Sequence, residues 1–237
     1  MPAHDIPARE RLIFALDVPS FAAARPLVER LGDAVQFYKI GLELAMSGEY
    51  FDLMRWLIER DKKVFADVKL YDIPATVARA VRQLARSGAT FCTVHGERGV
   101  TEAAAAEKGD TLKILAVTVL TSVEQRDLEQ VGITADLATL AMRRAEVAVA
   151  SGCDGVIASG HEAAALRARL GPGPLIVTPG IRPAAQRGTD DQKRVMGPAE
   201  ALRAGADYIV VGRPIRDAAD PYAAAVAIQD EIAAAVA

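Results

Sequence analysis

The sequence has few of the residues that build metal centres and disulfide frameworks. Its 237 residues include two cysteines and three histidines. Cys92 lies in an apolar run and Cys153 at a helix-to-strand turn, and neither has a neighbour at the spacing of a zinc ligand. We therefore expect no structural disulfide and no bound metal. The formal net charge of −3 also lacks the positive excess that attracts nucleic acid, so we expect no nucleic-acid partner.

Long apolar runs are absent as well. No run approaches the roughly 20 residues that are needed to cross a bilayer. The polar stretch 1–10, which we interpret as an N-terminal extension, does not resemble a signal peptide. We expect a cytoplasmic protein without a membrane partner. Since 51% of the residues are hydrophobic, 25% are charged and no linker-like segment divides them, residues 1–237 are expected to form a single domain.

Short apolar runs alternate with amphipathic segments along the whole chain. Their spacing of roughly 28 residues is close to that of a (β/α)8 barrel, and continuous apolar strands are typical of a parallel sheet that is covered by helices. An open doubly wound sheet is the alternative, but it normally carries a glycine fingerprint where this chain has ALDVPS. We predict an α/β fold, a (β/α)8 TIM barrel, with strands within 11–17, 34–41, 62–69, 89–96, 111–120, 153–160, 174–180 and 206–214.

The segments between these runs have apolar residues at helical spacing. Three glycines precede a strand, and each is expected to end a helix in the left-handed conformation. Asp220 is expected to cap the last helix ahead of Pro221. The helical windows are 42–60, 76–86, 136–150 and 162–170, and the three glycines are Gly88, Gly152 and Gly205.

Charged and polar residues gather where the predicted strands end. In a barrel of this kind the active site lies at the carboxyl ends of the strands, so these side chains are expected to converge on one mouth. They are Asp17 after the first strand, Lys39 on the second, Asp67 and Lys69 on the third, Thr121 and Ser122 after the fifth, and Gly212 and Arg213 after the eighth.

The run DVKLYD places a lysine among carboxylates. Asp67 and Lys69 are two residues apart on a strand and are expected to point to the same side, and Asp72 follows in the loop. Neighbouring carboxylates favour the charged ammonium form, which can protonate a carbanion. The alternative is a solvated strand end whose charges simply pair with one another. His95, on the fourth strand, either faces the same mouth or has a structural role.

DVKLYDIPATV resembles the D-x-K-x-x-D-I-P-x-T signature of the orotidine 5'-monophosphate decarboxylases. ALDVP, YKIGLEL, VTVLTS, TPGIRP, DDQKRV and VVGRPI occur in the order of that family and at compatible spacings, so the resemblance covers nearly the whole chain. Ala75 departs from the family pattern, because many members have asparagine there.

The resemblance implies the conversion of orotidine 5'-monophosphate to uridine 5'-monophosphate and carbon dioxide, the last step of de novo pyrimidine nucleotide synthesis. It implies no metal and no cofactor. Lys69 is then the proton donor to the carbon that loses carbon dioxide. Lys39, Asp67, Lys69 and Asp72 form an alternating charged network.

The resemblance also implies a set of substrate-binding residues. Asp17 and Lys39 resemble the ribose ligands, and Thr121 and Ser122 the residues that contact the pyrimidine. The long polar segment 180–198 is expected to close over the phosphate as a lid, or else to be an ordinary mobile loop. The protein is expected to be a homodimer with shared active sites, each completed by Asp72 and Thr76 of the partner chain. The phosphate region comprises Arg182, Gln192, Gly212 and Arg213.

Three other functions remain possible for this pattern. Magnesium-dependent sugar-phosphate decarboxylases and hexulose-phosphate synthases share the D-x-K-x-x-D skeleton, but they carry a carboxylate where this chain has Lys39, and a cation there opposes magnesium binding. A Schiff-base aldolase would need Lys69 deprotonated, which adjacent carboxylates oppose. A non-catalytic protein that binds phosphate metabolites would not need a lysine between two aspartates.

Overall fold

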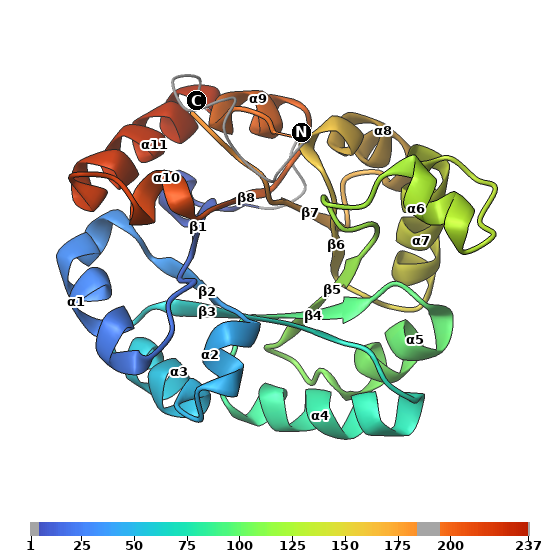
Figure 1. Ribbon diagram of the computed structural model, residues 1–237, viewed down its shortest axis with the longest axis horizontal. Coiled ribbons are helices and arrows are strands. Elements are labelled where there is room, and N and C mark those ends of the chain that lie inside the picture. The colour runs from blue at the N-terminus through green and yellow to red at the C-terminus, as the bar shows by residue number, and fades with distance from the viewer. Residues whose placement is uncertain (1–4, 184–194, 237) are drawn as a thin grey trace.

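The computed structural model describes residues 5–183 and 195–236. Eight parallel strands in these residues form a closed barrel in the order β1 to β8, and β8 pairs with β1. The helices surround the barrel as an outer ring (Figure 1). The predicted (β/α)8 barrel is therefore confirmed, and the open-sheet alternative is excluded.

A strand lies at each predicted apolar run, and β3 extends one residue beyond its run. The strands are β1 (Leu12–Ala15), β2 (Phe37–Ile40), β3 (Lys63–Leu70), β4 (Phe91–His95), β5 (Lys113–Val117), β6 (Gly155–Ile157), β7 (Leu175–Thr178) and β8 (Tyr208–Val211). The helices are η1 (Ala8–Glu10), α1 (Phe21–Leu31), η2 (Gly32–Ala34), α2 (Leu42–Met46), α3 (Tyr50–Ile58), α4 (Pro74–Arg86), α5 (Arg98–Glu107), α6 (Gln125–Gln130), α7 (Leu137–Ala150), α8 (Gly160–Leu170), α9 (Pro198–Arg203), α10 (Arg213–Arg216) and α11 (Pro221–Val236).

One predicted helical window was wrong in its continuity. Residues 42–60 form two helices, α2 and α3, because Gly48 adopts a φ of 83° between them. A left-handed residue cannot continue a right-handed helix. The predicted helix ends are confirmed, since Gly88, Gly152 and Gly205 have φ values of 83°, 89° and 103°. Asp220 caps α11 as predicted, and its Oδ1 accepts hydrogen bonds from the backbone of residues 222 and 223.

Aromatic side chains fill the inside of the barrel. The ring of Phe91 lies 4.9 Å from that of Phe37, 5.9 Å from that of Phe65 and 5.2 Å from that of Tyr208, measured between centroids. All four side chains are buried, together with the aliphatic residues that alternate toward the barrel axis. This layer closes the barrel interior below the carboxyl ends of the strands.

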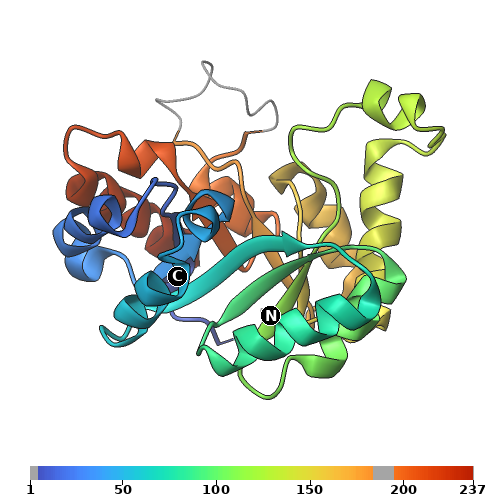
Figure 2. The ribbon, with the colours of Figure 1, turned by 60° about the horizontal axis from the view of Figure 1, so that its bottom comes forward.

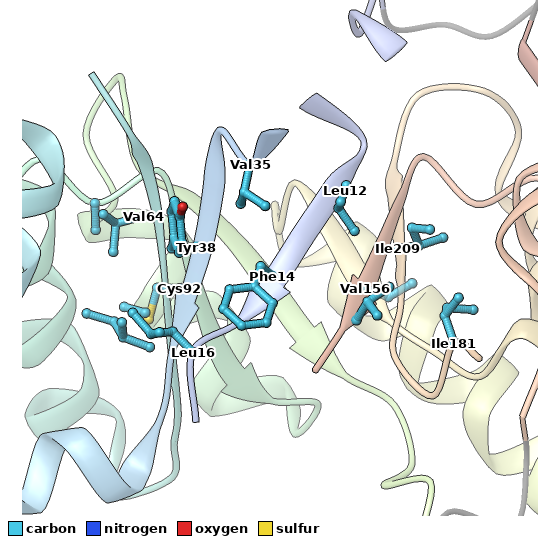
Figure 3. Packing of buried hydrophobic residues seen from close by; sticks show 14 of the residues in the cluster. Leu12, Phe14, Leu16, Val35, Tyr38, Val64, Cys92, Val156, Ile181 and Ile209 are labelled. Carbon is cyan, nitrogen blue, oxygen red and sulfur yellow. The ribbon is translucent and has the colours of Figure 1, made fainter. Parts of the chain in front are cut away.

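The opposite faces of the strands pack against the helices. Residues that alternate with the interior set, such as Leu12, Phe14 and Tyr38, lie between the barrel and the outer ring (Figure 3). Val156 and Ile209 continue this layer on β6 and β8. Within residues 5–183 and 195–236, no helix has the length and apolar character that crossing a bilayer requires.

Two aspartates fasten the amino-terminal ends of the strands in the same way. Asp154 and Asp207 each follow a helix-ending glycine by two residues, and each accepts a backbone hydrogen bond of 2.8 Å from the preceding strand of the barrel. Lys108 pairs with the first carboxylate at 2.9 Å and Arg167 with the second at 2.5 Å. These hydrogen bonds and ion pairs stabilise the amino-terminal end of the barrel. The carboxyl ends of the strands remain free for a site.

Candidate active site

A cavity of about 490 Å³ opens at the carboxyl ends of the strands. This lies within the range of roughly 300–1,000 Å³ that is typical of small-molecule sites. Phe65, Ala15 and Val210, whose side chains belong to the packed barrel interior, also line the cavity. The segment that carries α6 projects from the rest of the molecule (yellow-green in Figure 2). Leu120, at the start of that segment, lines the cavity.

Four charged residues on or just after three neighbouring strands form a row along the cavity. Lys39 Nζ lies 3.0 Å from Asp17 Oδ1 and 3.3 Å from Asp67 Oδ2. Lys69 Nζ lies 2.8 Å from the other oxygen of Asp67. The charges therefore alternate in the order Asp17, Lys39, Asp67 and Lys69, which brings together four of the residues that the sequence placed at strand ends.

The two inner members of the row are ionised over a wide pH range. Burial opposes the charged form of Asp67, but the ammonium groups of Lys39 and Lys69, with hydrogen bonds from Lys69 and Thr93, outweigh burial and lower the pKa of this carboxyl group. Burial likewise opposes the charge on Lys39, yet Asp67 and Asp17 raise the pKa of its ammonium group. A lowered carboxyl pKa and a raised ammonium pKa both extend the range in which this pair is charged.

Lys69 departs from regular strand geometry. Its φ of 48° lies in the left-handed region, which residues with a side chain rarely adopt. The pairing of β3 with β4 shifts register between Ala66 and Leu70, so the strand is irregular where Lys69 lies. The prediction that Asp67 and Lys69 point to the same side assumed a regular strand. The two side chains do meet, but through this irregular backbone.

The cavity also carries the arginines of the predicted phosphate region. Arg182, Gly212 and Arg213 line it, and Gly212 is the residue that precedes the short helix α10. Arg182 is only 5% exposed, and its backbone N–H donates to Met196 O at 2.9 Å. This bond joins the two described ends of the segment 180–198. Most of the predicted lid, including Gln192, lies outside the described residues.

Among the predicted site residues that the structure describes, three do not line the cavity of this single chain. Asp72 is exposed and its Oδ1 accepts the backbone N–H of Ile73 at 2.6 Å. Thr76 Oγ1 accepts a hydrogen bond of 3.2 Å from Arg79. Ser122 is exposed, whereas its neighbour Thr121 lines the cavity. The charged row of one chain therefore ends at Lys69 and does not reach Asp72.

His95 is not among the residues that line the cavity. Its ring packs on that of Tyr71, with 4.7 Å between the centroids. Burial lowers the pKa of His95, Glu97 raises it, and Arg144 and Lys69 lower it further. This arrangement favours a structural role.

No group of three or more histidine, cysteine, aspartate or glutamate side chains within the described ranges is placed to hold a metal ion. Asp17 and Asp67 face each other across Lys39, whose ammonium group contacts both carboxylates. A divalent cation at this point would meet a fixed positive charge. These residues therefore do not suit the magnesium site of the rival sugar-phosphate enzymes.

Comparison with known proteins agrees with this geometry. The sequence pattern of the Orotidine 5'-phosphate decarboxylase / HUMPS family matches residues 10–228. The chain belongs to this family. It is 56% identical to the orotidine 5'-phosphate decarboxylase of Methylococcus capsulatus over 227 residues, which is 96% of this chain and 93% of the relative. It is 55% identical to the enzyme of the same name from Xanthomonas euvesicatoria, over 97% of this chain and 94% of the relative.

Solved structures of the family have the same fold. The crystal structure of orotidine 5'-phosphate decarboxylase from Lactobacillus acidophilus matches with a TM-score of 0.83 and 36% identity, covering 94% of this chain and 99% of that chain. The enzyme from Pyrococcus horikoshii matches with a TM-score of 0.75 and 30% identity over 94% and 99% of the two chains. The resemblance seen in DVKLYDIPATV is thus confirmed.

Two polar residues of this family member were not predicted from the sequence. Arg216 lines the cavity, donates to Asp17 O at 3.0 Å and pairs with Asp217 at 2.6 Å. The sequence could have indicated Arg216 as a cavity residue, because it lies three residues after Arg213 on the same face of a helix. Thr93 is fully buried beside Asp67 and Lys69. In the sequence, Thr93 stands out as a polar residue at an inward position of the otherwise apolar run FCTV.

Proposed function

We propose that this protein is a carboxy-lyase that decarboxylates orotidine 5'-monophosphate to uridine 5'-monophosphate, in pyrimidine nucleotide synthesis. The observation that carries the proposal is the ammonium group of Lys69, held 2.8 Å from Asp67 in a cavity that also contains Arg182 and Arg213. A proton donor and phosphate-binding cations in one cavity are what this reaction requires. The family membership of the chain agrees with the same activity.

The reaction breaks one carbon–carbon bond and forms one carbon–hydrogen bond. As the bond from C6 of the pyrimidine to its carboxylate breaks, carbon dioxide leaves and the electron pair stays on C6. The Lys69 ammonium group stabilises this carbanion and transfers a proton to it, and the lysine then regains a proton from solvent. A substrate carboxylate bound beside Asp67 is repelled until its charge moves into the ring. Lys39 keeps Asp67 ionised.

Other residues in the cavity bind the nucleotide. Arg213, at the start of α10, and the buried Arg182 supply cationic donors for the phosphate, and Gly212 lets it approach the backbone. Gln192 is proposed to add a phosphate contact, by resemblance to the family. Asp17 and Lys39 bind the ribose hydroxyl groups. Thr121, with Ser122 beside it, contacts the pyrimidine.

The main alternative is a magnesium-dependent reaction on a sugar phosphate, since the enzymes of that class share the D-x-K-x-x-D skeleton. Lys39 between Asp17 and Asp67 favours the metal-free decarboxylase. The discriminating experiment is to add orotidine 5'-monophosphate and follow the loss of its ultraviolet absorbance with and without EDTA. We expect turnover that EDTA leaves unchanged. Activity that EDTA removes and magnesium restores would assign the protein to the rival class, and saturable binding without turnover would indicate a non-catalytic protein.

The active sites are proposed to be shared between two copies of the chain. Asp72 and Thr76 lie away from the cavity of their own chain, on the loop and helix that follow β3. Beside them Tyr71 is 63% exposed and Ile73 66% exposed. A second copy that covers these apolar side chains would place Asp72 and Thr76 at the cavity of its partner and extend the charged row beyond Lys69.

Two further proposals concern the chain as a whole. We propose that residues 1–237 form one domain, supported by a single closed barrel to which both the first and the last described helices belong. We propose a cytoplasmic location, supported by the buried, unpaired cysteines Cys92 and Cys153.

A further inference from the structure

Thr93 lies at the centre of β4 with no exposed surface. It does not line the cavity, yet its hydroxyl group contacts both residues on which the proposed chemistry depends. Thr93 Oγ1 donates to Asp67 Oδ1 at 2.8 Å, and the same oxygen accepts the backbone N–H of Lys69 at 3.0 Å. One hydroxyl group from a neighbouring strand therefore joins the backbone of the lysine to the carboxylate that pairs with its side chain.

This hydroxyl group replaces a hydrogen-bond acceptor that a regular pairing of β3 with β4 would provide. Between Ala66 and Leu70 the register of β3 against β4 shifts, and Lys69 within this interval takes the left-handed φ of 48°. A buried backbone N–H group that leaves the ladder needs another acceptor. Thr93 supplies that acceptor, and so it offsets part of the cost of the left-handed conformation at Lys69.

The three contacts close a small ring. Lys69 Nζ donates to Asp67 Oδ1, Thr93 Oγ1 donates to the same carboxylate oxygen, and the backbone of Lys69 donates to Thr93. Movement of the Lys69 backbone or of the Asp67 carboxylate breaks at least one of these bonds. The direction of the ammonium group is therefore coupled to the threonine hydroxyl group, although that group is out of reach of a molecule in the cavity.

We infer that Thr93 is a positioning residue for the decarboxylation proposed above, holding the Lys69 ammonium group and the Asp67 carboxylate in the relative orientation that proton transfer requires. The inference rests on that proposed function. It assigns Thr93 no contact with substrate. Loss of the hydroxyl group should therefore reduce the rate of the chemical step far more than the affinity for the nucleotide.

The decisive variant is Thr93→Val, which keeps the branched shape and removes the hydroxyl group. We expect kcat to fall by about tenfold or more, as for loss of a hydrogen bond to a charged group, while the dissociation constant of uridine 5'-monophosphate changes by less than about threefold. Thr93→Ser restores the hydroxyl group and should keep kcat within about threefold of wild type. Thr178→Val is the matched control, because Thr178 is a fully buried strand residue whose hydroxyl group has no hydrogen-bond partner among the described residues.

A second measurement follows the acid side of the pH profile. Asp67 contacts Lys39 from β2, Lys69 from β3 and Thr93 from β4, and its charge also acts on Cys92 of β4 and Tyr50 of α3. Burial raises the pKa of Cys92 to about 12 and also raises that of Tyr50, so both are neutral near pH 7. Without the Thr93 hydrogen bond the pKa of Asp67 rises. The acid limb of the kcat profile should therefore move to higher pH in Thr93→Val and not in Thr93→Ser or Thr178→Val.

Amide hydrogen exchange tests the geometry without any activity. The Lys69 amide should exchange faster in Thr93→Val than in Thr93→Ser, since only valine lacks the acceptor. If wild type turns over and Thr93→Val keeps its kcat, the inference is wrong. It is also wrong if product affinity falls as much as kcat, or if the serine variant is as impaired as the valine variant, because either result indicates general disruption. If wild type itself shows no decarboxylation, the proposed function fails, and the exchange rates still report the hydrogen bond.

Discussion

Lys69 is the proposed proton donor, and its backbone has an uncommon conformation. A left-handed residue that bears a side chain costs roughly 1–3 kcal/mol and persists only where its surroundings hold it in place. The hydrogen bond from its backbone to Thr93 and the ion pair with Asp67 provide that support. Strain of this kind concentrates at functional sites, so the backbone itself favours a functional role for Lys69.

Replacement of Lys69 by alanine should abolish decarboxylation and leave product binding measurable. The lysine acts mainly on the charge that develops in the transition state, whereas the phosphate is bound by other residues. Turnover and the affinity for uridine 5'-monophosphate are the quantities to measure. Lys113→Ala is the control, because Lys113 is an exposed lysine at the start of β5, at the opposite end of the barrel. Near-normal turnover of Lys69→Ala would remove the lysine from the mechanism.

Strand ends allowed several cavity residues to be predicted from the sequence. Asp17, Lys39 and Asp67 were found because charges in otherwise apolar runs stand out and parallel strands end at one face. Thr93 lies in the middle of a strand and not at its end, and a polar residue at an inward position was too weak a signal, since threonine is common in strands and its role depends on the irregular backbone of Lys69. Ser122 shows another limit, because beyond the strand end nothing in the sequence determines which of two adjacent hydroxyl groups faces the cavity.

At the scale of elements, the strands were predicted better than the helices. A strand lies at each of the eight runs, because burial on both faces requires continuous apolar sequence. The spacing of apolar residues predicts a helix over 42–60, whereas the segment divides into two helices at Gly48. Apolar residues keep a helical spacing across the break because α2 and α3 both bury residues against the barrel, such as Leu44 and Leu53. The periodicity therefore concealed the turn.

The contact between β6 and β7 requires a residue without a side chain at Gly155, which the sequence pattern does not indicate. A Cβ atom on Gly155 would lie 2.3 Å from the backbone oxygen of Leu175 and 2.6 Å from its Cβ. Gly155→Ala should therefore lower the free energy of unfolding by about 3 kcal/mol or more, at the upper end of overpacking effects, because backbone must move. Urea denaturation measures this. Gly173→Ala is the control, since a Cβ there meets nothing within 4 Å, and equal stability of the two variants would contradict the packing.

At the scale of the whole molecule, the proposed sharing of active sites can be tested by mixing two inactive variants. Lys69→Ala and Asp72→Ala subunits that pair should form one site lacking both groups and one site that is intact. With random exchange of equal amounts, activity should return to about a quarter of the wild-type rate per site, because half of the dimers are mixed. Each variant alone is the control. If mass measurements show that subunits exchange and no activity returns, Asp72 acts within its own chain.

The closure of the barrel joins the first strand to the last. Ile13 of β1 pairs with Val210 of β8, and Arg11 exchanges backbone and side-chain hydrogen bonds with this end of the chain. During synthesis on a ribosome at roughly 5–20 residues per second, β1 emerges roughly 10–40 s before the strand that completes it. Throughout that interval the nascent sheet has two open edges, which invite pairing with other chains. Asp17 and Arg213 can share a cavity only when the final helices are also being made, so catalytic competence is acquired at the very end of translation.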